Sequence, residues 1–254
     1  MEDTHCIICQ SPERKFYKNI KGRIGIKESY SLVKCICGLV YLNPRLSENE
    51  IKKYYNSPDY LPHSNNNAII NLLYTNFQKV TFLWKYKLLK KYNKNCNYLL
   101  DIGGGKGEFV SYINKKNIKS YNYDPYLETK KEYSKGTLSD NNEFDIITLW
   151  HSLEHIYNID ELFESLNKNL KIGGYVFIAI PNHDAYERKK FFKNNWVAYD
   201  SPRHLYHFNY FTFEKLVNKY KYKIVGSHRM MQDTLFNIRF SLNNNNIIKL
   251  IYMN

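Results

Sequence analysis

Short apolar stretches alternate with helical patterns along the second half of the chain. From residue 98 onward, six apolar stretches predict strands, and several are separated by segments whose apolar residues recur at helical spacing. The six read NYLLDIG, SYNYD, FDIITLW, YVFIAIPN, YKIVGSH and LFNIRF. Strands that alternate with helices form a mostly parallel sheet with helices on both faces. The hydrophobic pattern therefore predicts an α/β fold.

The first half of the chain has a different pattern. Residues 68–92 keep apolar side chains at helical spacing and predict one long helix. Upstream, CGLVYLNPR predicts a short strand ending at Asn43-Pro44, and SENEIKKYYN predicts a helix before the polar break SPDYLPHSNNN. We therefore expect three parts: an amino-terminal segment (1–45), a helical connector (46–95) and the sheet domain (96–254).

A glycine-rich loop, LLDIGGGKGEFV at residues 99–110, joins the first strand of the sheet domain to a helix. It is not a P-loop, and it lacks the dinucleotide fingerprint because Glu108 stands where the third glycine would be. Asp101 ends the strand, and an acid there would repel a pyrophosphate but suits an ammonium or sulfonium. Asp124 ends the next strand, placed to accept both ribose hydroxyls. The two acids indicate a nucleoside ligand without phosphates.

Composition and charge change this picture little. The 254 residues suffice for one well-cored domain and a small appendage, and the formal net charge is +13. The lysines are spread among Asn, Ile and Tyr, which favours scattered solvated lysines over a nucleic-acid surface. No apolar run reaches the ~20 residues of a membrane span, and the polar start MEDTHCIICQ is unlike a signal peptide. We therefore expect a cytoplasmic protein without a membrane span.

Four of the five cysteines form two close pairs, Cys6 with Cys9 and Cys35 with Cys37. In a reducing compartment such pairs indicate zinc, because four thiolates satisfy its tetrahedral geometry, and this spacing is typical of a zinc ribbon. The second pair is one residue closer than Cys-x-x-Cys, which leaves His5 as a conceivable substitute ligand. Unmetallated or disulfide-forming thiols are the alternative. A closed four-thiolate site has no open position, so the expected role of zinc is structural.

With the glycine loop and both acids in register, the chain resembles the class I S-adenosylmethionine (SAM)-dependent methyltransferases. The resemblance implies a doubly wound, mostly parallel, seven-stranded Rossmann-like sheet, here with a small N-terminal zinc ribbon. It implies that the loop lies under the methionine and ribose portions of SAM, with Asp101 at the cationic end and Asp124 on the ribose hydroxyls. An ordinary tight turn is the alternative. The expected cofactor-binding residues are Asp101, Gly103, Gly104, Gly105, Gly107, Asp124, Pro125 and Trp150.

A second motif follows FDIITLW, at the sheet edge where such ligands bind. The segment WHSLEHI resembles the post-strand motif of the ubiquinone-biosynthesis O-methyltransferases. Some relatives, notably the small-RNA 2′-O-methyltransferases, carry Glu-x-x-Glu-His in this region and bind a divalent metal. This chain has His151 in place of the first Glu, which favours a metal-free reaction. Glu154 and His155 are candidate catalytic residues; alternatively, they only cap the following helix.

A third motif, DSPRHLYHF, lies in a long insertion after YVFIAIPN. A structureless insertion of this length is usually functional. The motif resembles a segment of bacterial methyltransferases that combine an amino-terminal zinc ribbon with this catalytic domain, many of them in polysaccharide or secondary-metabolite pathways. Asp200, Arg203, His204 and His207 would suit a polyhydroxylated or anionic acceptor. Alternatively, the aromatic and histidine residues only pin a lid.

Together the motifs predict SAM-dependent methyl transfer to a hydroxyl of a sugar or other small metabolite. A hydroxyl acceptor must lose a proton, and a histidine is poised to take it. His151 or His155 is the expected base, with His204 or His207 as alternatives, and we expect these four imidazoles to meet at one cavity. The expected catalytic residues are His151, Glu154, His155, Arg203, His204 and His207. Two alternatives are an RNA methyltransferase, whose zinc ribbon and basic surface hold nucleic acid, and a non-catalytic SAM-binding module.

Overall fold

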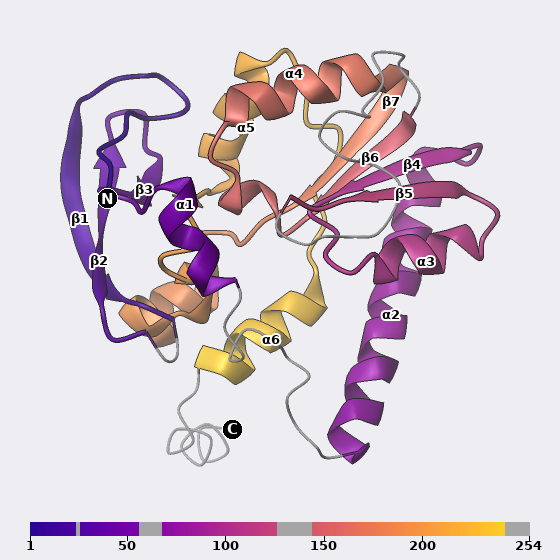
Figure 1. The fold of residues 1–254 in the computed structure, drawn as a ribbon, viewed down its shortest axis with the longest axis horizontal. Coiled ribbons are helices and arrows are strands. Elements are labelled where there is room, and N and C mark those ends of the chain that lie inside the picture. The colour runs from indigo at the N-terminus through magenta and orange to yellow at the C-terminus, as the bar shows by residue number, and fades with distance from the viewer. Residues whose placement is uncertain (24–25, 56–67, 126–143, 242–254) are drawn as a thin grey trace. The chain divides into compact units, whose positions relative to one another are not determined.

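The computed structural model describes residues 1–23, 26–55, 68–125 and 144–241. The chain divides into two compact units (Figure 1). The ribbon unit comprises Met1–Ile51 and Pro181–Asn254, and the sheet unit comprises Lys52–Ile180. The carboxy-terminal quarter of the chain therefore groups with the amino-terminal strands. The expected domain boundaries near residues 45 and 95 stay predictions.

A parallel sheet forms the centre of the sheet unit. Its strands are β4 (Tyr98–Ile102), β5 (Lys119–Tyr123), β6 (Phe144–Trp150) and β7 (Leu170–Ala179). They are hydrogen-bonded in the order β5-β4-β6-β7, and every neighbouring pair is parallel. The expected α/β fold is confirmed. Because β4 and β6 are neighbouring parallel strands, their carboxyl ends lie beside each other at one edge of the sheet.

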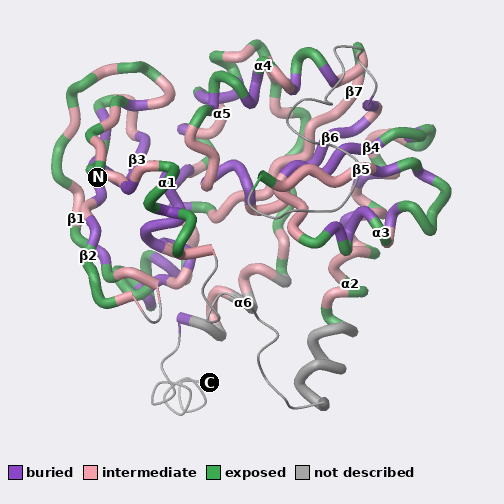
Figure 2. Tube along the Cα trace, in the orientation of Figure 1, coloured by how far each residue is buried: buried purple, intermediate pink, exposed green. Residues whose placement is uncertain are grey.

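Helices cover both faces of this sheet. The helices are α2 (Ala68–Tyr92), α3 (Glu108–Asn114) and α4 (Ile159–Asn169), and short 3-10 turns lie at Lys52–Tyr54 and Leu153–His155. One core joins Leu89 of α2, Phe109 and Ile113 of α3, and Leu99 and Ile146 of the strands. The α4 helix lies on the opposite face, and the buried stretches of β4 and β6 run between the two layers (Figures 1 and 2). The predicted long helix at residues 68–92 is confirmed.

The ribbon unit is built on a second, antiparallel sheet. Its strands are β1 (Arg14–Lys21), β2 (Ser29–Cys35), β3 (Val40–Leu42) and β8 (Tyr206–His207), in the order β1-β2-β3-β8. The edge strand β8 belongs to the DSPRHLYHF motif, and its His207 pairs with Val40. The helices are α1 (Glu48–Ile51), α5 (Tyr210–Lys219) and α6 (Met231–Ser241), with short π or 3-10 turns at Arg188–Phe192, Lys193–Asn195 and Val197–Tyr199. The insertion motif thus completes the amino-terminal sheet.

Two predicted strands are wrong. LFNIRF lies within the helix α6, because a short apolar run fits a helical period as well as a strand period. YKIVGSH has no regular secondary structure, and its Val225 is 63% exposed, whereas a strand in a parallel sheet is covered on both faces. The described residues contain four parallel strands, so the expected count of seven is not confirmed. The polar break SPDYLPHSNNN, residues 57–67, lies entirely outside the described residues.

Candidate functional site

The glycine loop between β4 and α3 uses backbone conformations that favour glycine. Gly103, Gly105 and Gly107 have φ values of 73°, 58° and 74°. A Cβ on Gly104 would collide with the Asn122 and Asp101 side-chain oxygens. A positive φ strains any residue other than glycine, so the first three positions favour glycine. At Gly104 the Asp101 and Asn122 oxygens leave no room for a larger side chain. The loop therefore brings bare backbone against the carboxyl ends of β4 and β5.

Asp101 is buried at the end of β4 with 1% of its surface exposed. Its Oδ1 accepts a hydrogen bond from the Thr148 hydroxyl at 2.5 Å. Burial raises the pKa of Asp101 to about 6, and the Thr148 hydrogen bond and the positive charge of Lys85 oppose that shift. An acid held in this way changes charge close to neutral pH.

Lys85 is a functional candidate that the sequence pattern did not single out. It lies on α2 and is 8% exposed. Its Nζ lies 4.3 Å from the centroid of the Trp150 ring and 5.2 Å from that of Phe109. A lysine among the apolar positions of a long helix was the signal available in the sequence, because such a lysine is rarely buried without a partner.

Asp124 follows β5 and organises the same loop. Its Oδ2 accepts a hydrogen bond from the Gly105 backbone N–H at 2.9 Å, and Asn122 Nδ2 donates to the Gly105 carbonyl at 2.8 Å. Pro125, next in the chain, is exposed. Among the described residues, Asn122 Oδ1 and Trp150 Nε1 are buried polar atoms without a hydrogen-bond partner. SAM is a nucleoside with a cationic end. Such a ligand fits a site with two acids, a bare glycine backbone and unsatisfied polar atoms.

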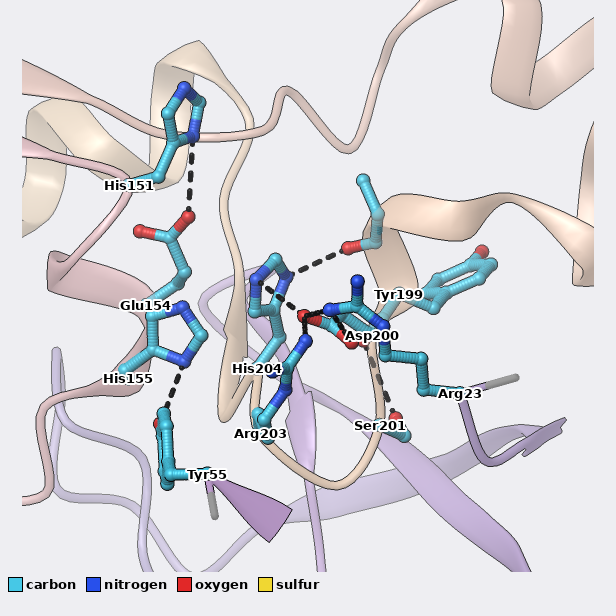
Figure 3. Close-up of polar contacts among 11 residues, drawn as sticks. Arg23, Tyr55, His151, Glu154, His155, Tyr199, Asp200, Ser201, Arg203 and His204 are labelled. Atoms are coloured by element: carbon cyan, nitrogen blue, oxygen red, sulfur yellow. Dashed lines mark hydrogen bonds and ion pairs between the residues drawn. The ribbon is translucent and has the colours of Figure 1, made fainter. Parts of the chain in front are cut away.

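The post-strand motif follows β6. His151 has a left-handed backbone with φ of 57°, a conformation that costs energy for a residue other than glycine, and its N–H donates to the Ala179 carbonyl at 2.9 Å. Its Nδ1 lies 3.6 Å from Oε1 of Glu154, which is completely buried (Figure 3). Ser152 ties the motif to the glycine loop, because its hydroxyl donates to the Ile102 carbonyl at 2.8 Å.

His155 is the last residue of the 3-10 turn that follows β6. Glu154 and His155 lie in the 3-10 turn Leu153–His155, and α4 begins later with its own cap, the Asn158 side chain. The Tyr55 hydroxyl lies 3.1 Å from Nδ1 of His155 (Figure 3). Asn158, rather than Glu154 or His155, therefore caps α4. Both histidines of the motif have a neighbour on Nδ1.

In the ribbon unit, two residues of the DSPRHLYHF motif and one distant arginine surround the Asp200 carboxylate. Asp200, with φ of 36°, receives hydrogen bonds from Arg203 Nη2 at 2.5 Å and from Arg23 Nη1 at 3.2 Å (Figure 3). His204 Nε2 lies 3.5 Å from the same carboxylate, and its Nδ1 lies 2.9 Å from the Ala198 carbonyl. Arg23 is a member that sequence reasoning missed, because it lies 177 positions from Asp200.

His207 has different neighbours. It is 4% exposed on β8, and its ring lies 5.3 Å from that of Tyr199 and 6.1 Å from that of His183. Burial lowers the pKa of His207 well below its usual value. The expectation that His204 or His207 meets His151 and His155 at one cavity stays a prediction.

The four predicted zinc ligands lie together in the ribbon unit. The Cys6 and Cys37 sulfurs are 3.5 Å apart, those of Cys9 and Cys35 are 3.4 Å apart, and all four lie within 4.8 Å of one another. Tetrahedral zinc with bonds of about 2.3 Å needs sulfurs roughly 3.8 Å apart, so the cluster fits the ion. Lysines of α5 hold both loops: Lys215 donates to the Cys37 carbonyl at 2.8 Å and Lys219 to the Ile7 carbonyl at 3.1 Å.

Solved structures that are similar to parts of this chain include methyltransferases. Within the described part of the chain, no helix has the length and apolar character needed to cross a membrane. No curated protein matches the chain. A crystal structure of a SAM-dependent methyltransferase from Archaeoglobus fulgidus is 20% identical, covers 65% of this chain and 86% of that chain, and has a TM-score of 0.43. The plantazolicin methyltransferase BpumL in complex with SAH is 17% identical, with coverages of 67% and 76% and a TM-score of 0.43.

The sequence comparison is decisive for the family. A family model described as a methyltransferase domain matches residues 71–226, which is more than half of the 254 residues. The match includes the glycine loop, both acids, the post-strand motif and DSPRHLYHF. The chain belongs to this methyltransferase family, and it is a class I SAM-dependent methyltransferase.

Proposed function

We propose that this methyltransferase acts on a hydroxyl group of a sugar or other small metabolite, with His151 as the general base. The observation that carries the proposal is the His151–Glu154 pair at the carboxyl end of β6, 3.6 Å apart and joined to the glycine loop through Ser152. A buried carboxylate on Nδ1 orients an imidazole and stabilises the charge that it gains with a proton. A hydroxyl is the acceptor that needs such a base.

The residues that would hold SAM are those around the glycine loop. Asp101 would meet the cationic end of the methionine portion, and Asp124 the ribose hydroxyls, with the bare backbone of the loop between them. When bound, SAM supplies an electrophilic methyl group on a sulfonium. The protein's share is to hold the acceptor hydroxyl in line and to remove its proton, which together can contribute several orders of magnitude in rate.

His155 is the second choice for the base, because a neutral tyrosine rather than a carboxylate lies on its Nδ1. A tyrosine hydroxyl fixes the ring but gives less support to a positive charge. His207 is disfavoured, since burial already holds its pKa far below its usual value. Replacing the first Glu of the metal-binding pattern by His151 also supports a reaction without a divalent metal, because Mg²⁺ prefers oxygen ligands.

We also propose that Cys6, Cys9, Cys35 and Cys37 hold one structural zinc ion. Burial raises the pKa of Cys35 to about 11 and that of Cys6 further. Four sulfurs clustered in this way suit an ion that binds thiolates. The ion would join the loop at Cys6 to the turn after β2.

The base is tested by comparing His151→Asn with His155→Asn, using labelled SAM and a panel of hydroxylated acceptors such as nucleotide sugars. We expect His151→Asn to lower kcat by about 10²–10⁴-fold with little change in the dissociation constant of S-adenosylhomocysteine (SAH). His228→Asn, at an exposed position of the same chain, is the matched control. Full activity in His151→Asn together with loss in His155→Asn would transfer the role to His155.

A further inference from the structure

A buried arginine in the ribbon unit is held by neutral hydrogen-bond partners. Arg188 is 6% exposed and starts the π-helical turn Arg188–Phe192. Its Nε donates to the His183 carbonyl, and its Nη1 donates to the Tyr199 hydroxyl at 3.1 Å. Both acceptors are neutral. Among the described residues no carboxylate forms an ion pair with Arg188, and nearby Asp184 pairs with Lys189 instead, at 2.9 Å. Buried charges are normally paired, so this guanidinium is an exception that calls for a ligand.

A second cation lies beside the same tyrosine. Lys18 Nζ is 5.6 Å from the Tyr199 ring centroid and donates to the Asn194 amide oxygen at 3.1 Å. Burial lowers the pKa of Lys18, and the charge of Arg188 lowers it further. Two cations that repel each other therefore lie near the same tyrosine, and among the described residues neither forms an ion pair with a carboxylate. An anion bound at this place would relieve both the desolvation and the repulsion.

Two neutral histidines complete the cluster. His183 and His207 are 6% and 4% exposed, their rings are 6.1 Å apart, and Nε2 of each is buried without a hydrogen-bond partner among the described residues. Burial lowers the pKa of His183 to about 3, so its ring is neutral at pH 7. A neutral imidazole can still donate one N–H to an anion.

The backbone around the cluster is irregular in two places. The register of β1 against β2 shifts between Phe16 and Lys18, which marks a β-bulge at Tyr17. The bulge brings Tyr17 to the His183 ring, with centroids 5.7 Å apart, while Lys18 reaches Tyr199. A bulge re-aims neighbouring side chains, and single π-helical turns occur frequently at functional sites. The β-bulge and the π-helical turn therefore both contribute residues to this cluster.

We propose that the ribbon unit binds an oxyanion, a phosphate or a carboxylate group, with Arg188 and Lys18 as its cationic ligands and His183 and His207 as neutral partners. A planar guanidinium suits both kinds of oxyanion because it can donate two parallel hydrogen bonds. The ligand would be a small molecule that carries a phosphate or carboxylate group.

The full-length protein provides the test. Inorganic phosphate and acetate are titrated separately at constant ionic strength, with chloride as the balancing anion, and binding is followed by calorimetry and by the rise in Tm. We expect Arg188→Gln to weaken binding of the preferred anion at least tenfold and Lys18→Gln about threefold. Lys190→Gln, an exposed neighbour on the same turn, is the matched control and should change it less than twofold. If Arg188→Gln fails to fold, the anion affinity of Lys18→Gln relative to that of Lys190→Gln decides whether the site exists.

The outcomes separate this site from the cofactor site. Anion binding that is absent, or equally weak in all three variants, overturns the proposal and leaves only a general attraction to a basic protein. SAH is titrated into the same preparations, and we expect its affinity to be unchanged by each variant. Failure of SAH to bind the unmodified chain would count against the proposed cofactor residues alone, because the anion measurement does not depend on it.

Discussion

At the scale of single residues, Asp101 makes the most direct prediction about pH. Its pKa is about 6 in the folded chain against an ordinary value of 3.8. The folded chain holds the proton more tightly, so this group's stabilising contribution is fully present below pH 3.8 and is lost as the pH rises through about 6. The difference corresponds to roughly 3 kcal/mol. Asp101→Asn should therefore stabilise the SAM-free protein at pH 7 and change its stability much less at pH 4, as measured by urea unfolding. Equal effects at both pH values would contradict the buried, protonatable acid.

The same acid should make cofactor binding depend on pH. If Asp101 meets the cationic end of SAM, only its ionised form is productive, and affinity should rise about tenfold per pH unit up to a plateau above pH 6. Calorimetric titration of SAM between pH 5 and 8 measures this slope. Asp101→Asn is the control, since it should bind weakly and without the slope. A slope that survives in the variant would assign the titration to another group.

Asp124 provides an independent check on the site. Asp124→Ala should weaken SAM binding by about 1.5–3 kcal/mol, because it removes charged hydrogen bonds to the ribose and also the acceptor of the Gly105 N–H. Asp124→Asn keeps an acceptor oxygen and should lose less. Calorimetry on the three proteins gives the ranking, and unchanged affinity in the alanine variant would remove Asp124 from the site.

At the scale of elements, the ribbon unit should depend on its metal. We expect one zinc ion per chain in anaerobically prepared protein, bound by the four clustered cysteines. Cys9→Ser should lower the zinc content, whereas Cys96→Ser, at the isolated cysteine of the sheet unit, should not. Loss of zinc should loosen the amino-terminal strands first, and hydrogen exchange can follow them separately from β4 and β6. Elemental analysis that finds no zinc would sink the proposal.

The α5 helix is expected to depend on its cap. The Asn209 side chain accepts a hydrogen bond from the Thr212 N–H at 2.9 Å, and the Thr212 hydroxyl accepts one from the Asn209 N–H at 3.0 Å. Asn209→Ala should cost about 1 kcal/mol of stability in the ribbon unit. Thermal unfolding compared with that of Asn218→Ala, at an exposed position of the same helix, measures the difference. Equal Tm values would show that tertiary packing alone holds α5.

At the scale of the whole molecule, the charge of +13 must be separated from the activity. We expect RNA to bind the protein at low salt through scattered lysines, with affinity falling steeply between 50 and 200 mM salt, roughly tenfold or more. We expect no labelled methyl group to reach that RNA. Filter binding at several salt concentrations, combined with label counting, tests both statements. Methylated RNA would overturn the small-molecule acceptor and revive the nucleic-acid alternative.

The sequence by itself determined the features that depend on the spacing of residues near one another in the chain. Asp101 and Asp124 end adjacent strands, and parallel strands bring their carboxyl ends to one edge, so the glycine loop and both acids could be assigned to one site in advance. The helix at residues 68–92 followed from apolar periodicity, and the cysteine cluster from paired spacing. Each of these signals lies in the identity and order of residues that are near in the chain or linked by a regular fold rule.

The tertiary structure decided the rest, because it depends on which distant segments pack together. Nothing local marks Arg23 as a partner of Asp200, or Arg188 as a buried cation beside Lys18. LFNIRF is helical, and a short apolar run of this kind has no preferred period in the sequence alone. Likewise, a two-residue strand such as β8 is stable only because β3 supplies its hydrogen bonds. Strand pairing, ion pairing and burial are properties of the folded chain. They set the charge and orientation of side chains that the sequence can only identify as candidates.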